Sequence, residues 1–584
     1  MLNADGSVGS AKWEASVPAH GARNIVTWSG TSGTAFSEAG LRAAGLWSPI
    51  NSLDLLNYLR GDASKEKRNG GTYRDRAAAL GDIVNSDPAF VHAQNYGYST
   101  LPEGGYASFV AGKKSRAKML YVGANDGFLR GFDVDTGVER FAYVPNAVIP
   151  KMAELSSPAY AHKYFVDGSP TAWDAYFGGW KTVLVGTTGA GGKAVFALDV
   201  TAPDSFGERN VLWEINSSTA KRTGEAVDPE YARRLGYTIG QAVVAKLRNG
   251  EWAAVFGNGY GSASNEASLY VVRISDGQLI RRIDTGIGTA GAPNGLGTPT
   301  LYDVNGDDVY DFVYAPDMLG NVWKFSLADS DAGSWKIAFD ATDSFRLGAP
   351  LFQARNATNG VQPISARIEL ASPPQGKSGI MVLFGTGRFF AVGDNTDTTR
   401  QSFYGIWDNG SPVAGRGALQ EQTVGTATID LRGVKDTTVR TVSSNAVDWS
   451  SQRGWYLDLP TSMERVIGTA VVRNNRVIFT TQIPSEDPCE FGGSGWLMEV
   501  SATTGAKLPY AVFDTSGDLL VDGKVDKDVS GMPITVGMVK TPLAIEGSPT
   551  AAKFLSGTKG EIQVERNRTF GKPLGRESWR EIRR

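Results

Sequence analysis

One recurring phrase limits the folds open to this chain more than any other feature of the sequence. An apolar strand ends at or near a glycine, and a small turn then leads into a second strand that runs into a turn of Asp, Gly or Ser. Returns such as "DTG", "SDG" and "TTG" supply tight turns, and we expect the glycine after the first strand to adopt a positive φ. The phrase therefore predicts a hairpin, with copies at residues 119–137, 182–203, 253–277, 311–329, 380–395 and 477–505.

Hairpins repeated in this way favour a β-propeller, in which each sheet buries its faces against neighbouring sheets. An array of β-sandwiches is the alternative that such a density of hairpins leaves open. The copies begin roughly 60 to 100 residues apart, so a propeller with this spacing needs long inserted loops. The polar region 395–450, rich in Thr and Gly, is the main candidate insertion. We therefore predict an all-β fold.

Composition agrees with this class and excludes several functions. A chain of 584 residues is longer than one hydrophobic core supports, which favours growth by repetition. With 58 basic and 61 acidic residues the net charge is −3, so no overall field attracts nucleic acid or an anionic membrane. No apolar run reaches the ~18 residues that a membrane-spanning helix needs.

The ends of the chain differ from its repeated middle. Residues 1–80 are predicted to be an N-terminal segment, partly helical, because Leu53, Leu56 and Leu59 recur near helical spacing. The polar start lacks a signal-peptide pattern, which we interpret as a fragment cut from a longer exported protein. The rest of the chain is expected to form a propeller domain and a C-terminal tail, at residues 81–550 and 551–584.

The stretch "DVNGDDVYD" has the spacing of a metal-binding loop. Side-chain oxygens stand at its first, third, fifth and ninth positions, and a backbone carbonyl is available at the seventh. This is the ligand rhythm of an EF-hand loop whose closing acid has moved from position twelve to position nine. The donors are hard oxygens without nearby His or Cys, which suits Ca²⁺ better than zinc or copper, and Mg²⁺ demands stricter geometry. The predicted ligands are Asp303, Asn305, Asp307, Val309 and Asp311.

The negative charge of this loop predicts its behaviour without a metal ion. Three gathered carboxylates repel one another, so we expect the loop to loosen without a cation. The alternative is an ordinary Asx turn whose acids are solvated.

A second stretch, "DTSGDLLVD", repeats the spacing with a poorer ligand, Ser, at its third position. Its candidate ligands are Asp514, Ser516, Asp518, Leu520 and Asp522.

Several motifs in order along most of the chain resemble one protein family. They include "LGDIVNSDPAFV", "YVGANDGFLRGFD", "GTPTLYDVNGDDVYDFVYAPDMLGNVWKFSL" and "GGSGWLMEV", and they extend from about Leu80 to Val500. Together they resemble the C-terminal domain of PilY-type proteins, which are tip-associated biogenesis factors and adhesins of bacterial type IV pili. The resemblance implies a modified seven-bladed propeller of quinoprotein-like repeats, with one calcium loop at Asp303–Asp311.

The resemblance also implies a function. Calcium occupancy in this family is linked to the balance between pilus extension and retraction, and so to twitching motility and surface adhesion. The expected partners are pilins or minor pilins of the pilus tip, with a host-surface receptor as a further candidate. The expected location is outside the cell, at the surface, at the pilus tip or in association with the outer membrane.

Two other functions are alternatives to this one. Gly-rich strand phrases also occur in quinone-dependent dehydrogenase propellers, but the single cysteine cannot form the adjacent pair against which many of them stack the quinone. We therefore expect no enzymatic activity and assign no catalytic residue. The triplet Arg60, Gly61 and Asp62 invites an integrin-binding interpretation, yet Gly61 in this position is also suited to ending a helix, with Asp62 in the following turn.

Overall fold

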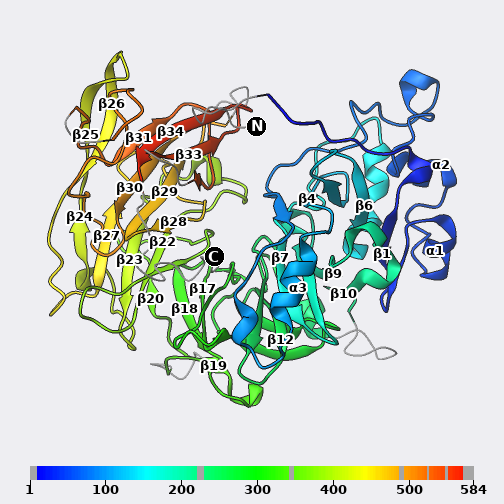
Figure 1. Cartoon of the computed structure of the whole chain (residues 1–584), viewed down its shortest axis with the longest axis horizontal. Coiled ribbons are helices and arrows are strands. Elements are labelled where there is room, and N and C mark those ends of the chain that lie inside the picture. The colour runs from blue at the N-terminus through cyan, green and yellow to red at the C-terminus, as the bar shows by residue number, and fades with distance from the viewer. Residues whose placement is uncertain are drawn as a thin grey trace. The chain divides into compact units, whose positions relative to one another are not determined.

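A computed structural model describes most of the chain (Figure 1). Short strands, mostly antiparallel, account for most of the regular structure. Two compact units are recognised, an N-terminal unit made mainly of Ala11–Val313 and a C-terminal unit made mainly of Ile337–Glu581. None of the helices in the described part of the chain has the length and apolar character needed to cross a membrane. The described residues are 10–219, 229–340, 348–485, 492–521, 525–545 and 550–569.

The first sheet of the N-terminal unit takes two of its strands from the segment 1–80. The strand order is β2-β1-β6-β5-β4-β3. β1 runs parallel to β6, with Val26 opposite Tyr143, and β2 forms the outer edge beside β1. This segment therefore completes a sheet, which the sequence pattern did not predict. The bounds are β1 (Ile25–Trp28), β2 (Gly33–Ala35), β3 (Ala89–Val91), β4 (Met119–Gly123), β5 (Leu129–Asp133) and β6 (Glu139–Val144).

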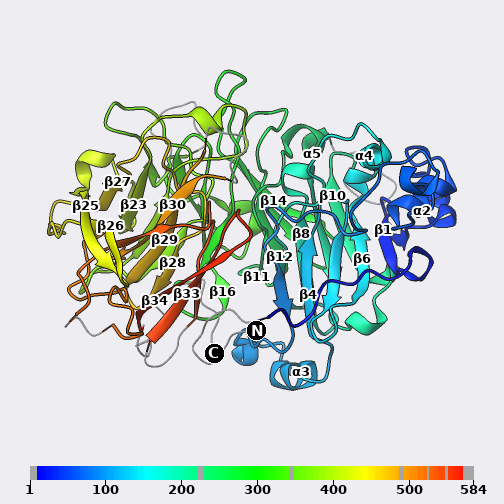
Figure 2. The same ribbon diagram turned by 90° about the horizontal axis from the view of Figure 1, so that it is seen from above.

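Two short helices of the same segment, α1 and α2, lie near β1 (Figure 1), and Figure 2 shows α2 beside β1 from above. The side chain of Ser52 caps α2 by accepting the amide of Leu55 at 3.0 Å. Leu55 and Leu56 join Ile25 and Leu41 in one buried cluster. The helix predicted from the leucine spacing is thus confirmed. The helices are α1 (Glu38–Ala43), α2 (Leu53–Leu59), α3 (Tyr106–Lys113), α4 (Ile149–Met152) and α5 (Pro229–Arg234).

Two further sheets of the N-terminal unit have the orders β10-β9-β8-β7 and β14-β13-β12-β11-β16. β9 and β11 are buried along their whole length. Strands buried on both faces lie between other layers, as stacking of propeller blades requires. The bounds are β7 (Thr171–Tyr176), β8 (Trp180–Thr187), β9 (Ala194–Asp199), β10 (Val211–Asn216), β11 (Val243–Leu247), β12 (Trp252–Gly257), β13 (Ser268–Arg273), β14 (Leu279–Asp284) and β16 (Val309–Tyr310).

The next sheet in chain order has the strand order β15-β17-β18-β19, and β20 also pairs with β18. β16 lies between β15 and β17 in the sequence but belongs to the sheet of β11. The chain therefore leaves one sheet at the end of β15, visits another, and returns at β17. The bounds are β15 (Thr300–Tyr302), β17 (Phe312–Pro316), β18 (Asn321–Ser326), β19 (Lys336–Ile337) and β20 (Phe352–Gln353).

The C-terminal unit holds sheets of order β21-β22-β23-β27-β24, β25-β26-β31-β30-β29-β28 and β32-β33-β34. Phe403 of β23 stacks on Phe479 of β29 at 4.0 Å between ring centroids, which packs the first of these sheets on the second. The bounds are β21 (Glu369–Ala371), β22 (Ile380–Gly385), β23 (Ser402–Asp408), β24 (Gln420–Gln422), β25 (Val424–Leu431), β26 (Val434–Val442), β27 (Gly454–Asp458), β28 (Val471–Arg473), β29 (Arg476–Ile483), β30 (Ser494–Ser501), β31 (Gly531–Ile534), β32 (Leu543–Ile545), β33 (Thr550–Ser556) and β34 (Ile562–Arg568).

The repeated phrase forms antiparallel strand pairs at five of its six copies, namely β4-β5, β8-β9, β12-β13, β17-β18 and β29-β30. The copy at 380–395 is the exception. Its first half is β22, but "RFFAVGDN" is a loop, and β22 pairs instead with β23 further along the chain. The hairpin prediction is confirmed for the other copies.

Two segments expected to be irregular contain strands. Within 395–450, β25 and β26 form a long hairpin whose inner strand joins the sheet of β31 (Figure 1). In β25 the exposed Thr426, Thr428 and Asp430 alternate with partly buried apolar residues, so the hairpin exposes one face and its polarity did not mark it as a strand pair. The expected tail 551–584 begins with the hairpin of β33 and β34.

The glycines that end a first strand differ from those that follow it. Gly186 and Gly257 do not take a positive φ. A Cβ on Gly186 would lie 2.3 Å from the Phe196 ring, and one on Gly257 would lie 2.3 Å from the Leu296 carbonyl. Other segments of the same chain come so close to Gly186 and Gly257 that only glycine, which has no Cβ, fits at these positions. The predicted positive φ occurs at glycines that follow the first strand, such as Gly259, with φ 73°.

Candidate metal centre

The loop Asp303–Asp311 lies where the chain passes from one sheet to another. It follows β15 and contains β16, which pairs in parallel with β11. In this pairing Val309 lies opposite Lys246, and Tyr310 lies opposite Leu247. The loop is therefore attached at both ends to strands, which limits the conformations open to its side chains.

Asp303 is the centre around which the loop turns. Its side chain is fully buried, and its two carboxylate oxygens accept the amides of Gly306 at 2.7 Å and Asp308 at 2.9 Å. Both donors have left-handed backbones, with φ 75° and 65°. Glycine adopts this conformation without strain, and Asp is among the residues that tolerate it. The sequence "NGDD" thus curls the chain around the first predicted ligand.

Asn305 and Asp307 continue the same pattern on the outer side of the loop. The side-chain oxygen of Asn305 accepts the Asp307 amide at 3.2 Å, and an oxygen of Asp307 accepts the Val309 amide at 2.9 Å. Burial acts to raise the pKa of the Asp307 carboxyl, but hydrogen bonds from Val309, Asn305 and Arg248 outweigh it and hold this pKa below its usual value. Asp307 is thus stabilised in its charged form.

Asp311 closes the loop. One of its carboxylate oxygens accepts the amide of Val304 at 3.0 Å, and its own amide donates to the Tyr302 carbonyl at 3.0 Å. The Asp311 carbonyl accepts the amide of Leu327 at 2.8 Å. The structure therefore brings the predicted ligands of this loop into one compact turn.

Arg248, which the sequence pattern did not indicate, supplies a positive charge to two carboxylates of the loop. It lies in the turn between β11 and β12, and its guanidinium donates to Asp307 at 3.0 Å and to Asp311 at 2.6 Å. The hydrogen bond to Asp311 contributes most to raising the pKa of Arg248. Its position in the sequence gives no sign of this contact, because only the parallel pairing of β11 with β16 brings the turn to the loop.

The donor set of the loop fits a calcium ion. Its groups are carboxylate, amide and carbonyl oxygens, the hard ligands that Ca²⁺ prefers. Arg248 places one positive charge against two of the carboxylates and offsets part of their mutual repulsion. As the side chains stand, however, no three acidic, histidine or cysteine groups in the described residues are gathered as a ready-made metal site. Binding of an ion would therefore require these side chains to change position.

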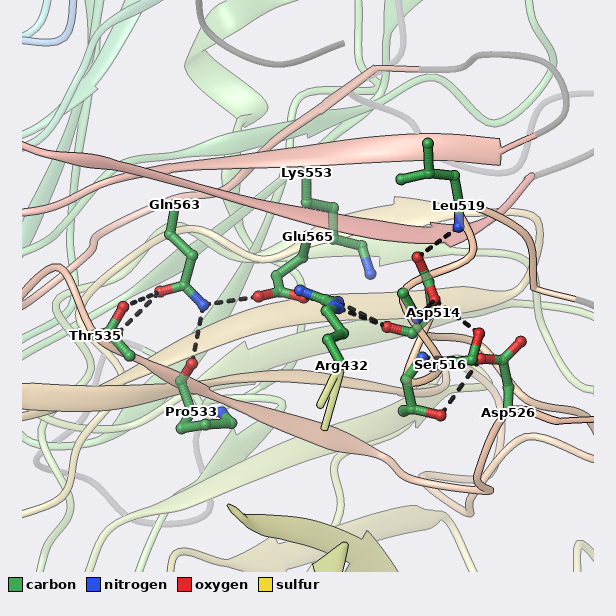
Figure 3. Close-up of polar contacts among 12 residues, drawn as sticks. Arg432, Asp514, Ser516, Leu519, Asp526, Pro533, Thr535, Lys553, Gln563 and Glu565 are labelled. Carbon is green, nitrogen blue, oxygen red and sulfur yellow. Dashed lines mark hydrogen bonds and ion pairs between the residues drawn. The ribbon is translucent and has the colours of Figure 1, made fainter. Parts of the chain in front are cut away.

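The second candidate loop has the same local conformation (Figure 3). Asp514 is buried, and its carboxylate accepts the amides of Gly517 at 2.6 Å and Leu519 at 3.1 Å. Both donors are again left-handed, with φ 85° and 66°. Asp518 accepts the Leu520 amide at 2.9 Å, as Asp307 does with Val309. A positive φ is unusual for leucine, so the loop imposes it here.

The described part of the second loop is closed by Asp526. Asp522 lies outside the described residues. Asp526 accepts the amides of Thr515 at 2.8 Å and Ser516 at 3.2 Å. In the first loop Asp311 likewise accepts the amide of the second loop residue, Val304. Arg432 donates to the Asp514 carbonyl rather than to its carboxylate (Figure 3). Asp522 stays a prediction, and Asp526 is an acid at this loop that the spacing did not indicate.

The triplet of Arg60, Gly61 and Asp62 follows α2, as the helix-ending interpretation predicted. Gly61 has φ 114°, and the Asp62 side chain accepts the amide and hydroxyl of Ser64 in a turn. The Arg60 guanidinium donates to three backbone carbonyls, those of His20, Phe36 and Arg23. Arg60 therefore ties α2 to the preceding chain, and its guanidinium is not free for a partner.

Comparisons with known proteins agree with the motifs. The chain matches the family model described as the PilY1 beta-propeller domain over residues 80–441. A type IV pilus biogenesis factor PilY1 homolog of Xylella fastidiosa (strain Temecula1) is 38% identical over 92% of this chain and 38% of its own length. PilY1 of Pseudomonas aeruginosa (strain PAK) is 38% identical over 83% of this chain and 43% of its own length.

The same family is found among solved structures. The crystal structure of the Pseudomonas aeruginosa PilY1 C-terminal domain superposes with a TM-score of 0.69 at 33% identity, covering 83% of this chain and 100% of that domain. The chain spans about two fifths of the length of the curated relatives above. The predicted propeller is confirmed, and the number of its blades stays a prediction. The chain belongs to the PilY1 β-propeller domain family.

Proposed function

We propose that this domain binds Ca²⁺ in the loop Asp303–Asp311 and serves type IV pilus biogenesis without enzymatic chemistry. The observation that carries the proposal is the buried Asp303, around which two left-handed residues wrap a chain of hard oxygen donors. A buried carboxylate costs free energy unless it is compensated, and a divalent cation compensates it more strongly than amides alone. Family membership supports the pilus-related role.

The residues that would hold the ion are those predicted from the spacing. They are Asp303, Asn305, Asp307 and Asp311 through side-chain oxygens and Val309 through its carbonyl. A bound Ca²⁺ supplies the positive charge that reverses the repulsion among the carboxylates. The chain's own contribution is to hold Asp303 in place and to attach the loop to β11 through β16. Occupancy of the loop would thereby stiffen the connection between the two sheets.

The proposed setting is outside the cell, at the surface, at the pilus tip or in association with the outer membrane. Calcium near ~10⁻³ M there would fill a site with a dissociation constant of ~10⁻⁴ M. We propose pilins or minor pilins as partners, with a host-surface receptor as a further candidate. Through these contacts occupancy would influence pilus extension and retraction, twitching motility and surface adhesion.

The second loop is the weaker candidate for a metal site. Its conformation matches that of the first, which favours the same chemistry. Ser516 is a poorer ligand than Asn305, and Asp514, Asp518 and Asp526 would supply the carboxylates in the described part of the loop. We therefore rank it below the loop Asp303–Asp311.

A motility experiment tests the proposed role. Asp311→Ala would be introduced into the full-length protein of a piliated bacterium that depends on it, with Asp331→Ala as the control, since Asp331 is an exposed acid outside the loop. The expected result is reduced twitching and altered surface piliation for Asp311→Ala alone, at normal protein levels. Normal twitching and piliation in that strain would contradict the proposed role.

A further inference from the structure

The carboxylate oxygens of Asp303, Asp307 and Asp311 accept hydrogen bonds from two kinds of N–H donor, uncharged amides and a charged guanidinium. Backbone amides bind both oxygens of Asp303 and one oxygen each of Asp307 and Asp311. These amides belong to the folded loop and stay in place as long as it does. The remaining oxygens of Asp307 and Asp311 accept hydrogen bonds from the guanidinium of Arg248, and that oxygen of Asp307 also accepts the side-chain amide of Asn305 at 3.1 Å.

The guanidinium of Arg248 is free to move without unfolding the turn that carries it. The side chain is 31% exposed. The turn between β11 and β12 is held by its own backbone, because the Leu247 amide donates to the Glu251 carbonyl and the Gly250 amide to the Leu247 carbonyl, both at 2.9 Å. Neither bond involves the Arg248 side chain. The guanidinium is therefore the charged donor at the loop that can leave most readily.

We propose that Arg248 is an internal cation that competes with Ca²⁺ for the carboxylates of Asp307 and Asp311. This inference rests on the proposed calcium site. The planar guanidinium binds two carboxylates at once, and lysine, as a single point charge, would not do so equally well. In the ion-free protein it offsets the repulsion that the sequence predicts would loosen the loop. Ion binding requires it to withdraw from these oxygens.

The competition has two consequences. The apparent affinity for Ca²⁺ is lower than the loop alone would give, because only molecules with the guanidinium withdrawn are competent to bind. Ion binding also releases the Arg248 side chain at the turn between β11 and β12. Calcium would thereby alter the charge presented by a hairpin that supplies no ligand to the ion.

The test compares Arg248→Gln with Arg273→Gln in the whole domain. Arg273 lies on β13 of the same sheet and pairs with Asp276 at 3.1 Å and Glu251 at 3.7 Å rather than with the loop, so its loss removes the same charge from the same sheet. Calcium binding is measured by calorimetry, and thermal unfolding is measured in chelator and in calcium. We expect Arg248→Gln to lower the dissociation constant about tenfold, and Arg273→Gln to change it by less than about twofold.

The unfolding temperatures supply a second measurement that does not depend on affinity. In chelator, Arg248→Gln is expected to unfold at a lower temperature than the wild type, because the carboxylates lose their cation. Calcium is expected to raise the unfolding temperature of Arg248→Gln more than that of the wild type.

The outcomes separate this inference from the function on which it rests. Binding by Arg248→Gln but not by the wild type would support the competition strongly. Equal or weaker affinity in Arg248→Gln, with calcium binding intact in the wild type, would overturn the inference and leave the calcium site standing. Absence of binding in both proteins would overturn both proposals.

Discussion

Asp311 accepts the backbone amide of Val304 at 3.0 Å, so the ninth residue of the loop closes on its second. An EF-hand loop is closed by the acid at position twelve. Here β16 begins at the seventh residue, Val309, and the closing acid must come soon after it. The short spacing between first and last acid thus follows from the way the loop enters the neighbouring sheet.

Replacement of Asp303 by Ala is expected to lower the free energy of unfolding by about 3 kcal/mol, because two amides lose their acceptor in a buried site. Chemical denaturation measures the effect. Asn305→Ala serves as the control, since Asn305 is exposed and accepts one long hydrogen bond. Equal stability of Asp303→Ala and the control would show that Asp303 does not organise the loop.

Replacement of Asp526 by Ala is expected to open the second loop. Hydrogen exchange at the amides of Thr515 and Ser516 is expected to accelerate by about tenfold or more, because Asp526 is their acceptor. The matched control is Asp528→Ala, which removes a nearby exposed acid paired with Lys507. Unchanged exchange in Asp526→Ala would remove Asp526 as the residue that closes this loop.

Replacement of Arg60 by Ala is expected to lower the free energy of unfolding by about 3 kcal/mol, since three carbonyls lose their donor. Arg42→Ala, which removes an exposed guanidinium paired with Glu38, is expected to cost about 0.5 kcal/mol or less. Denaturation curves of the two variants give the comparison. If Arg60→Ala were as stable as Arg42→Ala, the structural role of Arg60 would be wrong, and its guanidinium would again be a candidate for partner binding.

Stability is expected to depend on pH through Lys151. Its amine donates to the carbonyls of Tyr164, at 2.7 Å, and Gly191, and burial lowers its pKa to about 8 from an ordinary value of 10.5. The folded state therefore disfavours the charged amine. This penalty is fully present below pH 8 and is relieved as the pH rises towards 10.5.

The variant Lys151→Met isolates this effect, because it carries no titrating group. The wild type is expected to gain stability relative to Lys151→Met between pH 8 and 10.5. Unfolding temperatures of both proteins across this range provide the measurement. If the difference in unfolding temperature between the wild type and Lys151→Met stayed constant with pH, the Lys151 amine would titrate as it does in water.

Much of the architecture was predictable from local patterns. The strand pairs of five phrases, the helix α2 and the compact loop around Asp303 depend on residues close together in the sequence. Such short-range features are recorded in turn residues, apolar runs and ligand spacing. The β-propeller followed from their repetition.

The features that were missed depend on contacts between distant segments. The parallel pairing of β1 with β6 joins residues more than a hundred positions apart, and Arg248 reaches the loop through the pairing of β11 with β16. The glycines at the ends of first strands are required by close approach of another chain segment, as at Gly257. No local pattern records which segment will approach.

Calorimetric titration of the purified domain with Ca²⁺ tests the central claim most directly. Asp311→Ala is compared with the wild type and with Asp331→Ala, whose exposed carboxylate lies outside the loop. We predict that the binding heat of the loop disappears in Asp311→Ala while the fold is retained, and that Asp331→Ala binds like the wild type. Undiminished affinity in Asp311→Ala would contradict the assignment of the loop Asp303–Asp311 as the calcium site.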